Sequence, residues 1–196
     1  MAKTLRQLKS VIAKAKALDN KELHAELNQI LAAMKHPWPK AFRLLSKLLQ
    51  CASSQTTKHY IADLFGEAKD PQVLKPLMRA AKASENREYS ANFLFPCAQY
   101  DCTSHVNFFV QFLLNCKDPG EAMAGCVHVI EEMEGPFDPD ITRRNVAKLL
   151  GRDRSMIPGD LQTQDEVLTL QAAYALLDKY FSQVDRQWKL ELRVSS

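Results

Sequence analysis

Three residues in the middle of the chain have the types and spacing of metal ligands. Cys97, Cys102 and His105 form a C-x4-C-x2-H cluster, and zinc prefers thiolate and imidazole ligands of this kind. A tetrahedral site needs a fourth ligand, and no second closely spaced pair of cysteines supplies one. Free cysteines are also commonly buried as small hydrophobic residues. The sequence therefore favours buried thiols over a metal site, and it predicts no cofactor.

Covalent catalysis has no local motif in this chain. The sequence contains neither a G-x-S-x-G nucleophile turn nor a glycine-rich phosphate loop, and its 6 glycines leave few places to build one. A Cys–His nucleophilic pair is defined by geometry and not by order along the chain, so the sequence leaves that alternative open. We expect a protein that is not an enzyme.

The composition is that of an ordinary globular domain, with 196 residues of which 46% are hydrophobic and 25% charged. The number of cysteines is odd, and the basic stretch from Met1 to Ser10 is not followed by the apolar core of a secretion signal. Both features favour a reducing, cytoplasmic location. No segment approaches the roughly 18 apolar residues of a transmembrane helix, so we expect no membrane association.

Charge is distributed unevenly along the chain. The net charge of +3 is composed of +8 over residues 1–60, −7 over residues 61–140 and +2 over residues 141–196. Such a polarised chain can steer a charged partner to either end. Solvated helix faces whose charges differ in sign without any functional reason would give the same counts.

Apolar residues recur at helical spacing over most of the chain. They predict helices near residues 5–15 and 22–34, followed by paired helices that begin near residue 39. Equivalent apolar positions in successive pairs are 32 or 33 residues apart, as in Phe42 with Leu74, Leu45 with Leu77, and Val73 with Val106. A period of this size in helix pairs is typical of a solenoid, whose units bury their apolar faces against their neighbours.

One of these pairs resembles the HEAT family of α-helical repeats. It reads Asp70-Pro71-x-x-Leu74-x-Pro76-Leu77-Met78, with an interior proline, and then Asn86-x-x-Tyr89-x-Ala91-x-Phe93-Leu94. The similarity covers roughly residues 39–151, although the period is shorter than the family's usual ~40–47 residues and Ser90 stands where the family often has arginine. It implies an all-α, right-handed α-α superhelix of the HEAT or armadillo type. Residues 1–196 would form one such domain, with residues 1–38 as an N-terminal capping hairpin, 39–151 as repeats, and 152–196 as a C-terminal capping helix and tail.

The resemblance also implies a binding function, because the second helices of HEAT pairs typically line a concave groove. The expected contact residues for a protein partner are His59, Asp63, Glu88, Asn92, Gln99, His128, Glu131 and Glu132. We therefore expect a non-catalytic protein-binding module, either an adaptor and scaffold or an immunity-type inhibitor that neutralises a toxin.

An acidic cluster near the third helix pair could bind a basic protein, such as a nuclease domain. It consists of Glu131, Glu132, Glu134, Asp138 and Asp140. The arginines that follow could instead neutralise the cluster within the fold; they are Arg143, Arg144, Arg152 and Arg154.

The alternative function is that of a nucleic-acid-binding or DNA-repair protein of the HEAT-like type. Basic side chains of the N-terminal region could neutralise phosphates, and Trp38 could stack on a base. The basic residues are Lys3, Arg6, Lys9, Lys14, Lys16, Lys35, Lys40, Arg43, Lys47 and Lys58. The acidic cluster would repel a duplex that ran along the full groove.

The last part of the chain allows more than one structure. Helices are expected from Asp140 to Leu150, ending at a left-handed Gly151, and from about Gln162 to Val184. Apolar and charged residues then alternate over residues 188–194, which is the period of a strand. That tail would be an apolar strap, a strand added to another chain, or a continuation of the helix.

Overall fold

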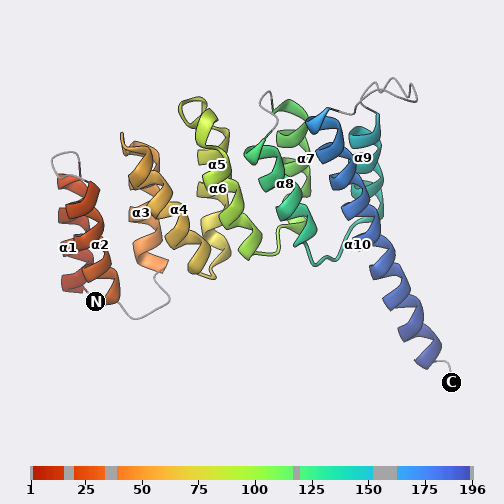
Figure 1. Ribbon diagram of the computed structural model, residues 1–196. Coiled ribbons are helices and arrows are strands. Elements are labelled where there is room, and N and C mark those ends of the chain that lie inside the picture. Colours follow the sequence, from red (N-terminus) through yellow and green to blue (C-terminus); the bar gives the residue numbers. More distant parts are fainter. Residues whose placement is uncertain (1, 16–19, 34–38, 117–119, 152–162, 195–196) are drawn as a thin grey trace. The chain divides into compact units, whose positions relative to one another are not determined.

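The chain is all-helical in a computed structural model (Figure 1). The structure describes residues 2–15, 20–33, 39–116, 120–151 and 163–194, with the backbone alone for residues 2, 39, 40 and 190–194. No strand occurs among these residues, which confirms the all-α prediction. Within the same ranges, none of the helices combines the length and the apolar character needed to cross a bilayer. The chain folds as two compact units, Met1–Cys97 (unit 1) and Ala98–Ser196 (unit 2).

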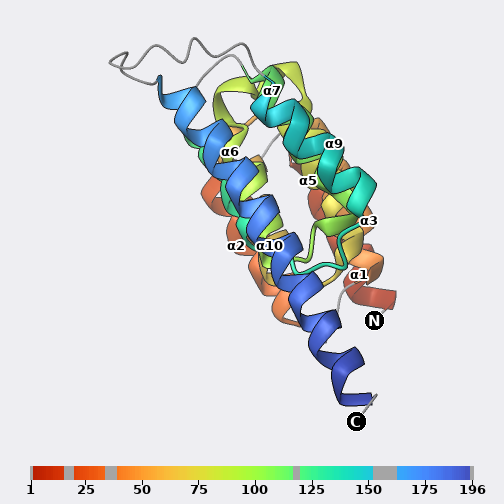
Figure 2. The same ribbon diagram turned by 90° about the vertical axis from the view of Figure 1, so that its right-hand side faces the viewer.

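Unit 1 is built from helical hairpins in two layers. Its elements are α1 (Ala2–Lys14), α2 (Asn20–Ala32), α3 (Pro39–Cys51), α4 (Gln55–Glu67), the 3₁₀ turn η1 (Pro71–Val73), α5 (Leu74–Lys82), η2 (Ser84–Tyr89) and α6 (Ala91–Leu94). Helix α3 packs between α1 and α5, and α4 packs between α2 and α6. Figure 2 shows α1, α3 and α5 on one side of the unit and α2 and α6 on the other. The first helices of the hairpins therefore form one layer and the second helices form the other.

The core of unit 1 consists of the apolar positions that gave the helical periodicity. Leu8, Leu27, Leu45, Ile61 and Phe65 are fully buried, and burying a side chain of this size contributes about 1.5–3 kcal/mol.

The start of helix α4 is determined by a side chain close by in the sequence. The Ser54 hydroxyl accepts a hydrogen bond from the backbone N–H of Thr57, which caps α4.

The predicted second helix over residues 86–94 forms only in part, because this segment breaks into η2, the four-residue α6 and the 3₁₀ turn η3 (Phe95–Gln99). The Ser90 hydroxyl lies within hydrogen-bond distance of the backbone carbonyls of Ala81, Asn86 and Arg87, and its single donor competes there with regular helical hydrogen bonds. Pro96 lacks an N–H and cannot extend α6. This hairpin therefore has an irregular second half.

Unit 2 contains η4 (Thr103–His105), α7 (Val106–Asn115), α8 (Glu121–Glu131), α9 (Pro139–Leu150) and α10 (Gln164–Val194). The long helix α10 packs along α8 and α9, and α7 packs against α8 and α9. Phe109, Cys126, Ile130 and Leu176 form part of its fully buried core.

One expectation for the C-terminal region is corrected, and one of its open alternatives is confirmed. Gly151 ends α9 with φ −80°, so it is not left-handed; an added Cβ would lie 2.8 Å from the Ala147 carbonyl oxygen, which explains a glycine here. Of the three structures left open for the tail, the continuation of the helix is confirmed, because α10 runs through Val194. The sequence also predicts that a helix restarts at Asp118 and Pro119, which lie outside the described residues.

Candidate functional site

The loop between α8 and α9, residues 134–138 (the pinned loop), is held at its start by two side chains that precede α7. The carboxylate of Asp101 accepts hydrogen bonds from the backbone N–H of Thr103 at 3.0 Å and of Glu134 at 3.2 Å. The Thr103 hydroxyl oxygen accepts from the N–H of Gly135 at 2.9 Å. Two successive backbone donors of the loop are thus fixed by residues more than 30 positions away in the sequence.

The end of the pinned loop is held by α10. The Gln183 amide oxygen accepts from the Phe137 N–H at 2.6 Å, and its amide nitrogen donates to the Phe137 carbonyl at 3.1 Å. Phe137 itself is buried, with 3% of its surface exposed. Both backbone groups of a buried residue are therefore satisfied by one side chain, which fixes the loop against the core of unit 2.

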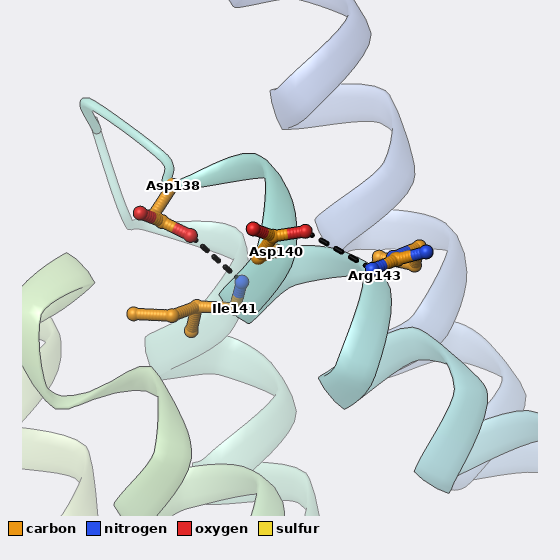
Figure 3. Close-up of polar contacts among 4 residues, drawn as sticks. All are labelled: Asp138, Asp140, Ile141 and Arg143. Atoms are coloured by element: carbon orange, nitrogen blue, oxygen red, sulfur yellow. Dashed lines mark hydrogen bonds and ion pairs between the residues drawn. The ribbon is translucent and has the colours of Figure 1, made fainter.

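The pinned loop leads directly into the start of α9 (Figure 3). The Asp138 carboxylate accepts from the Ile141 N–H at 2.8 Å and so caps the helix, with Pro139 at its first position. Two residues further on, Asp140 lies 3.0 Å from the Arg143 guanidinium, and both side chains are more than three-quarters exposed. An exposed pair of this kind contributes little to stability, typically about 0–1 kcal/mol.

Exposed carboxylates surround the pinned loop. We call Asp101, Glu132, Glu134, Asp138 and Asp140 the acidic loop surface; all five are exposed. Among the residues that the structure describes, Asp140 is the member of this set with an ion-pair partner. Arg144 is exposed, and Arg152 and Arg154 lie outside the described ranges. A fixed backbone with unneutralised carboxylates creates a local negative potential that attracts a cationic surface.

The eight expected contact residues are divided equally between the units. In unit 1, His59 and Asp63 are exposed on α4 with Nε2 and Oδ1 3.5 Å apart, while Glu88 of η2 is exposed and Asn92 of α6 is half-buried. The other four lie in unit 2.

In unit 2 the expected contact residues lie on α8, at its C-terminal cap and at the end of η3. Glu132, at the end of α8, belongs to that surface. Its neighbour Glu131 is half-buried and accepts a hydrogen bond from the Gln171 amide at 2.7 Å. His128 is half-buried on α8, and Gln99 is exposed at the end of η3. The structure therefore brings together the α8 members of the predicted set.

Sequence reasoning missed the residues that pin the loop. The Asp-x-Thr spacing at residues 101–103 is a signal that could have been used, because an aspartate that accepts from the N–H two residues on forms an Asx turn. Gly135-Pro136 is also a turn signal. Gln183 carries no signal, because it lies 46 residues from Phe137.

A substitution at Gly135 tests how firmly the loop is held. Its φ of +95° disfavours any L side chain, and an added Cβ would lie 3.0 Å from the Gln183 amide oxygen and 3.1 Å from the Phe137 ring. We expect Gly135→Ala to lower the free energy of unfolding by about 1–3 kcal/mol. Gly120→Ala is the control, since its Cβ would meet nothing within 4 Å. Urea unfolding followed by circular dichroism measures both, and equal effects would contradict the strain at Gly135.

The cysteine and histidine cluster of the sequence lies around η3 and η4. Cys97 and Cys102 are fully buried, and the Cys97 thiol donates to the Phe93 carbonyl at 3.3 Å. No group of three or more His, Cys, Asp or Glu side chains in the described ranges is arranged to hold a metal ion. Burial raises the pKa of the Cys102 thiol to about 12, with a further contribution from the Asp101 carboxylate. Burial likewise raises the pKa of Cys126.

These pKa shifts predict selective thiol chemistry. The thiolate is the reactive form, so at pH 8 Cys102 should be alkylated on the order of a hundredfold more slowly than a thiol of ordinary pKa, because its thiolate is scarce although more nucleophilic. Cys51 is exposed on α3 and should react first. Timed labelling with iodoacetamide and peptide mass spectrometry measures the rates, with protein in denaturant as the control. Labelling of native Cys102 as fast as Cys51 would contradict the burial.

Comparison of the chain with models of protein families, with curated proteins and with solved structures gave no match.

Proposed function

We propose that the protein is a non-catalytic protein-binding module with HEAT-like architecture, acting as an adaptor or as an immunity-type inhibitor of a toxin in the cytoplasm. The observation that carries this proposal is the acidic loop surface of unit 2. Its exposed carboxylates belong to or adjoin a loop whose backbone is held by hydrogen bonds to Asp101, Thr103 and Gln183. The partner we propose is a basic protein, of which a nuclease domain is one type.

Two physical effects make this surface suited to binding. Because the loop is already held in one conformation, little conformational entropy is lost when a partner binds. Because its charges have one sign, they accelerate encounter with a basic partner and disfavour acidic ones. We include Glu131 and His128, beside the loop on α8, in the proposed contact surface of unit 2. His59, Asp63, Glu88 and Asn92 are its proposed counterparts in unit 1.

A capture experiment with two matched variants tests the proposal. The purified chain is used to capture proteins from nuclease-treated lysate of its own cells. We expect Glu132→Lys/Glu134→Lys to reduce recovery of a basic partner at least about tenfold, because attraction becomes repulsion. The control Glu26→Lys/Glu67→Lys makes the same change in charge at exposed sites of unit 1 and should keep the partner. Equal recovery with both variants, or a partner lost on nuclease treatment, would overturn the proposal.

A second candidate function, contact with the phosphate backbone of nucleic acid, is supported by the first-helix layer of unit 1. Helices α1, α3 and α5 contain no aspartate or glutamate. Their exposed basic side chains, which we call the basic layer, are Lys3, Arg6, Lys9, Lys14, Arg43, Lys47, Lys75, Arg79 and Lys82. Arg43 and Lys47 recur one repeat later as Lys75 and Arg79, each 32 residues on.

The basic layer differs from the basic region predicted from the sequence. Lys58 does not belong to it, because this side chain is buried, with 4% exposed, and bonded to Asn86. Lys16, Lys35 and Trp38 lie outside the described residues, and the side chain of Lys40 is not described. The α5 residues were not in the predicted set. The candidate surface is therefore the first-helix layer of unit 1, and not a continuous stretch of the first 60 residues.

A further inference from the structure

The C-terminal helix α10 has a second apolar side. It is 31 residues long, and one side is buried within unit 2 by Thr169, Ala172, Ala173 and Leu176, none of which is exposed. The helix packs along α8 and α9. A helix that served only as the last element of the unit would need no other apolar side.

The other apolar side of α10 follows a heptad repeat. Val167, Tyr174, Phe181 and Trp188 are each seven residues apart, and Leu170, Leu177 and Val184 follow the first three after three residues. We call these seven residues the α10 stripe. Tyr174, Phe181 and Trp188 expose 65%, 62% and 63% of their surface. A repeat of seven with apolar residues at the first and fourth positions is the pattern of a coiled-coil seam, in which another helix covers the stripe.

The end of α10 stands apart from the rest of its unit. In Figure 1 the C-terminal end of α10 extends beyond α8 and α9, and residues 185–189 are all exposed, as is Val184. Helical segments of this length are marginal in water unless they pack against another element. The projecting end would therefore be stabilised by a partner that covers it.

We propose that the α10 stripe is the dimer interface of the protein, and that the stripe of a second copy of this chain covers it as a parallel coiled coil. This inference is independent of the proposed function. A two-fold axis brings the same stripe from both copies together, so the apolar surface is matched without any other partner.

The exposed area is sufficient for such a contact. A buried aromatic side chain covers roughly 200 Å², so the exposed parts of Tyr174, Phe181 and Trp188 correspond to about 130 Å² each. With Val167 and Val184, which are 46% and 40% exposed, two copies would bury about 1,000 Å². This is the size from which specific interfaces begin.

The flanking charges select the parallel orientation. In a parallel coiled coil, the residue that follows the second apolar position of a heptad lies opposite a residue of the other helix. That residue is the one that precedes the first apolar position of a heptad there. Asp185 would face Tyr180 of the second copy, so no like charges meet there. In an antiparallel pair, Asp178 and Asp185 of the two copies would face each other and repel. Charge thus favours two stripes that run in the same direction.

Mass measurement across a range of protein concentrations tests the dimer. We expect the full chain to approach twice its 22.2 kDa mass and the variant Phe181→Glu/Trp188→Glu to remain monomeric, with its dissociation constant raised at least about a hundredfold. Phe181→Ser/Trp188→Ser repeats the test without added charge. The control Ser182→Glu/Lys189→Glu adds more negative charge on the polar side of the same helix and should still dimerise.

Disulfide cross-linking tests the orientation, in a Cys51→Ser background that removes the exposed native thiol. Val184→Cys should cross-link to itself in a parallel pair, while Ser182→Cys should not; peptide mass spectrometry identifies the bond. A monomer at all concentrations, or a dimer that persists in both of the double variants at Phe181 and Trp188, would overturn the proposal. A dimer in which Val184→Cys forms no cross-link would overturn its parallel arrangement.

Discussion

Asn86→Ala should lower the free energy of unfolding of unit 1 by about 3–5 kcal/mol, because it leaves a buried ammonium group without its partner. Lys58 and Asn86 are 4% and 2% exposed, and the Lys58 Nζ donates to the Asn86 Oδ1 at 2.7 Å. The same oxygen accepts from the Gln55 amide at 3.1 Å, and the Asn86 amide donates to the Ala80 carbonyl at 2.9 Å. One side chain therefore satisfies three groups drawn from α4 and α5.

A double-mutant cycle separates the buried charge from the other contacts of Asn86. Lys58→Met removes the ammonium group and keeps most of the side-chain volume, so Asn86→Ala should cost at least about 2 kcal/mol less in that background. Urea unfolding followed by circular dichroism gives all four free energies. A loss below about 1 kcal/mol in the otherwise unchanged chain would show that another acceptor replaces Asn86. The Gln55 amide oxygen is one such acceptor, since it is buried without a hydrogen-bond partner.

Replacing four residues of the basic layer by glutamine should weaken binding to a short DNA duplex on the order of 100-fold at low salt, if unit 1 binds phosphates as the second candidate function proposes. The variant is Arg43→Gln/Lys47→Gln/Lys75→Gln/Arg79→Gln, whose four side chains are all exposed. Each lost phosphate contact should reduce the slope of log affinity against log salt by about 0.9. Fluorescence anisotropy at several salt concentrations measures affinity and slope together.

A matched variant in unit 2 controls for net charge. Arg144→Gln/Lys148→Gln/Lys179→Gln/Arg186→Gln removes the same number of positive charges and should leave the slope unchanged. An equal loss with both variants would mean that net charge, and not the basic layer, attracts the duplex. A full-length chain that binds no duplex at low salt would eliminate the second candidate function. Capture of a basic protein through the acidic loop surface would be unaffected by that result.

Local information determined much of this protein. Apolar residues at helical spacing predicted both the helices and the core, because a residue three or four positions from another shares its face wherever the helix packs. Leu45, Leu77 and Phe109 are buried as their spacing indicates. The starts of α4 and α9 also follow from the sequence, because a capping side chain bonds to a backbone N–H only three residues away.

Interactions between distant residues decided the rest. Nothing in the local sequence distinguishes Lys58 from the exposed lysines. Its ammonium group can be buried because Asn86, 28 residues further along the chain, accepts a hydrogen bond from it. The pinned loop depends in the same way on Asp101 and Gln183. The protein that would bind its carboxylates is therefore a proposal and not a prediction from the sequence. Spacing within one helix encodes which face is apolar, whereas the satisfaction of a buried polar group requires a second group that only tertiary packing brings within hydrogen-bond distance.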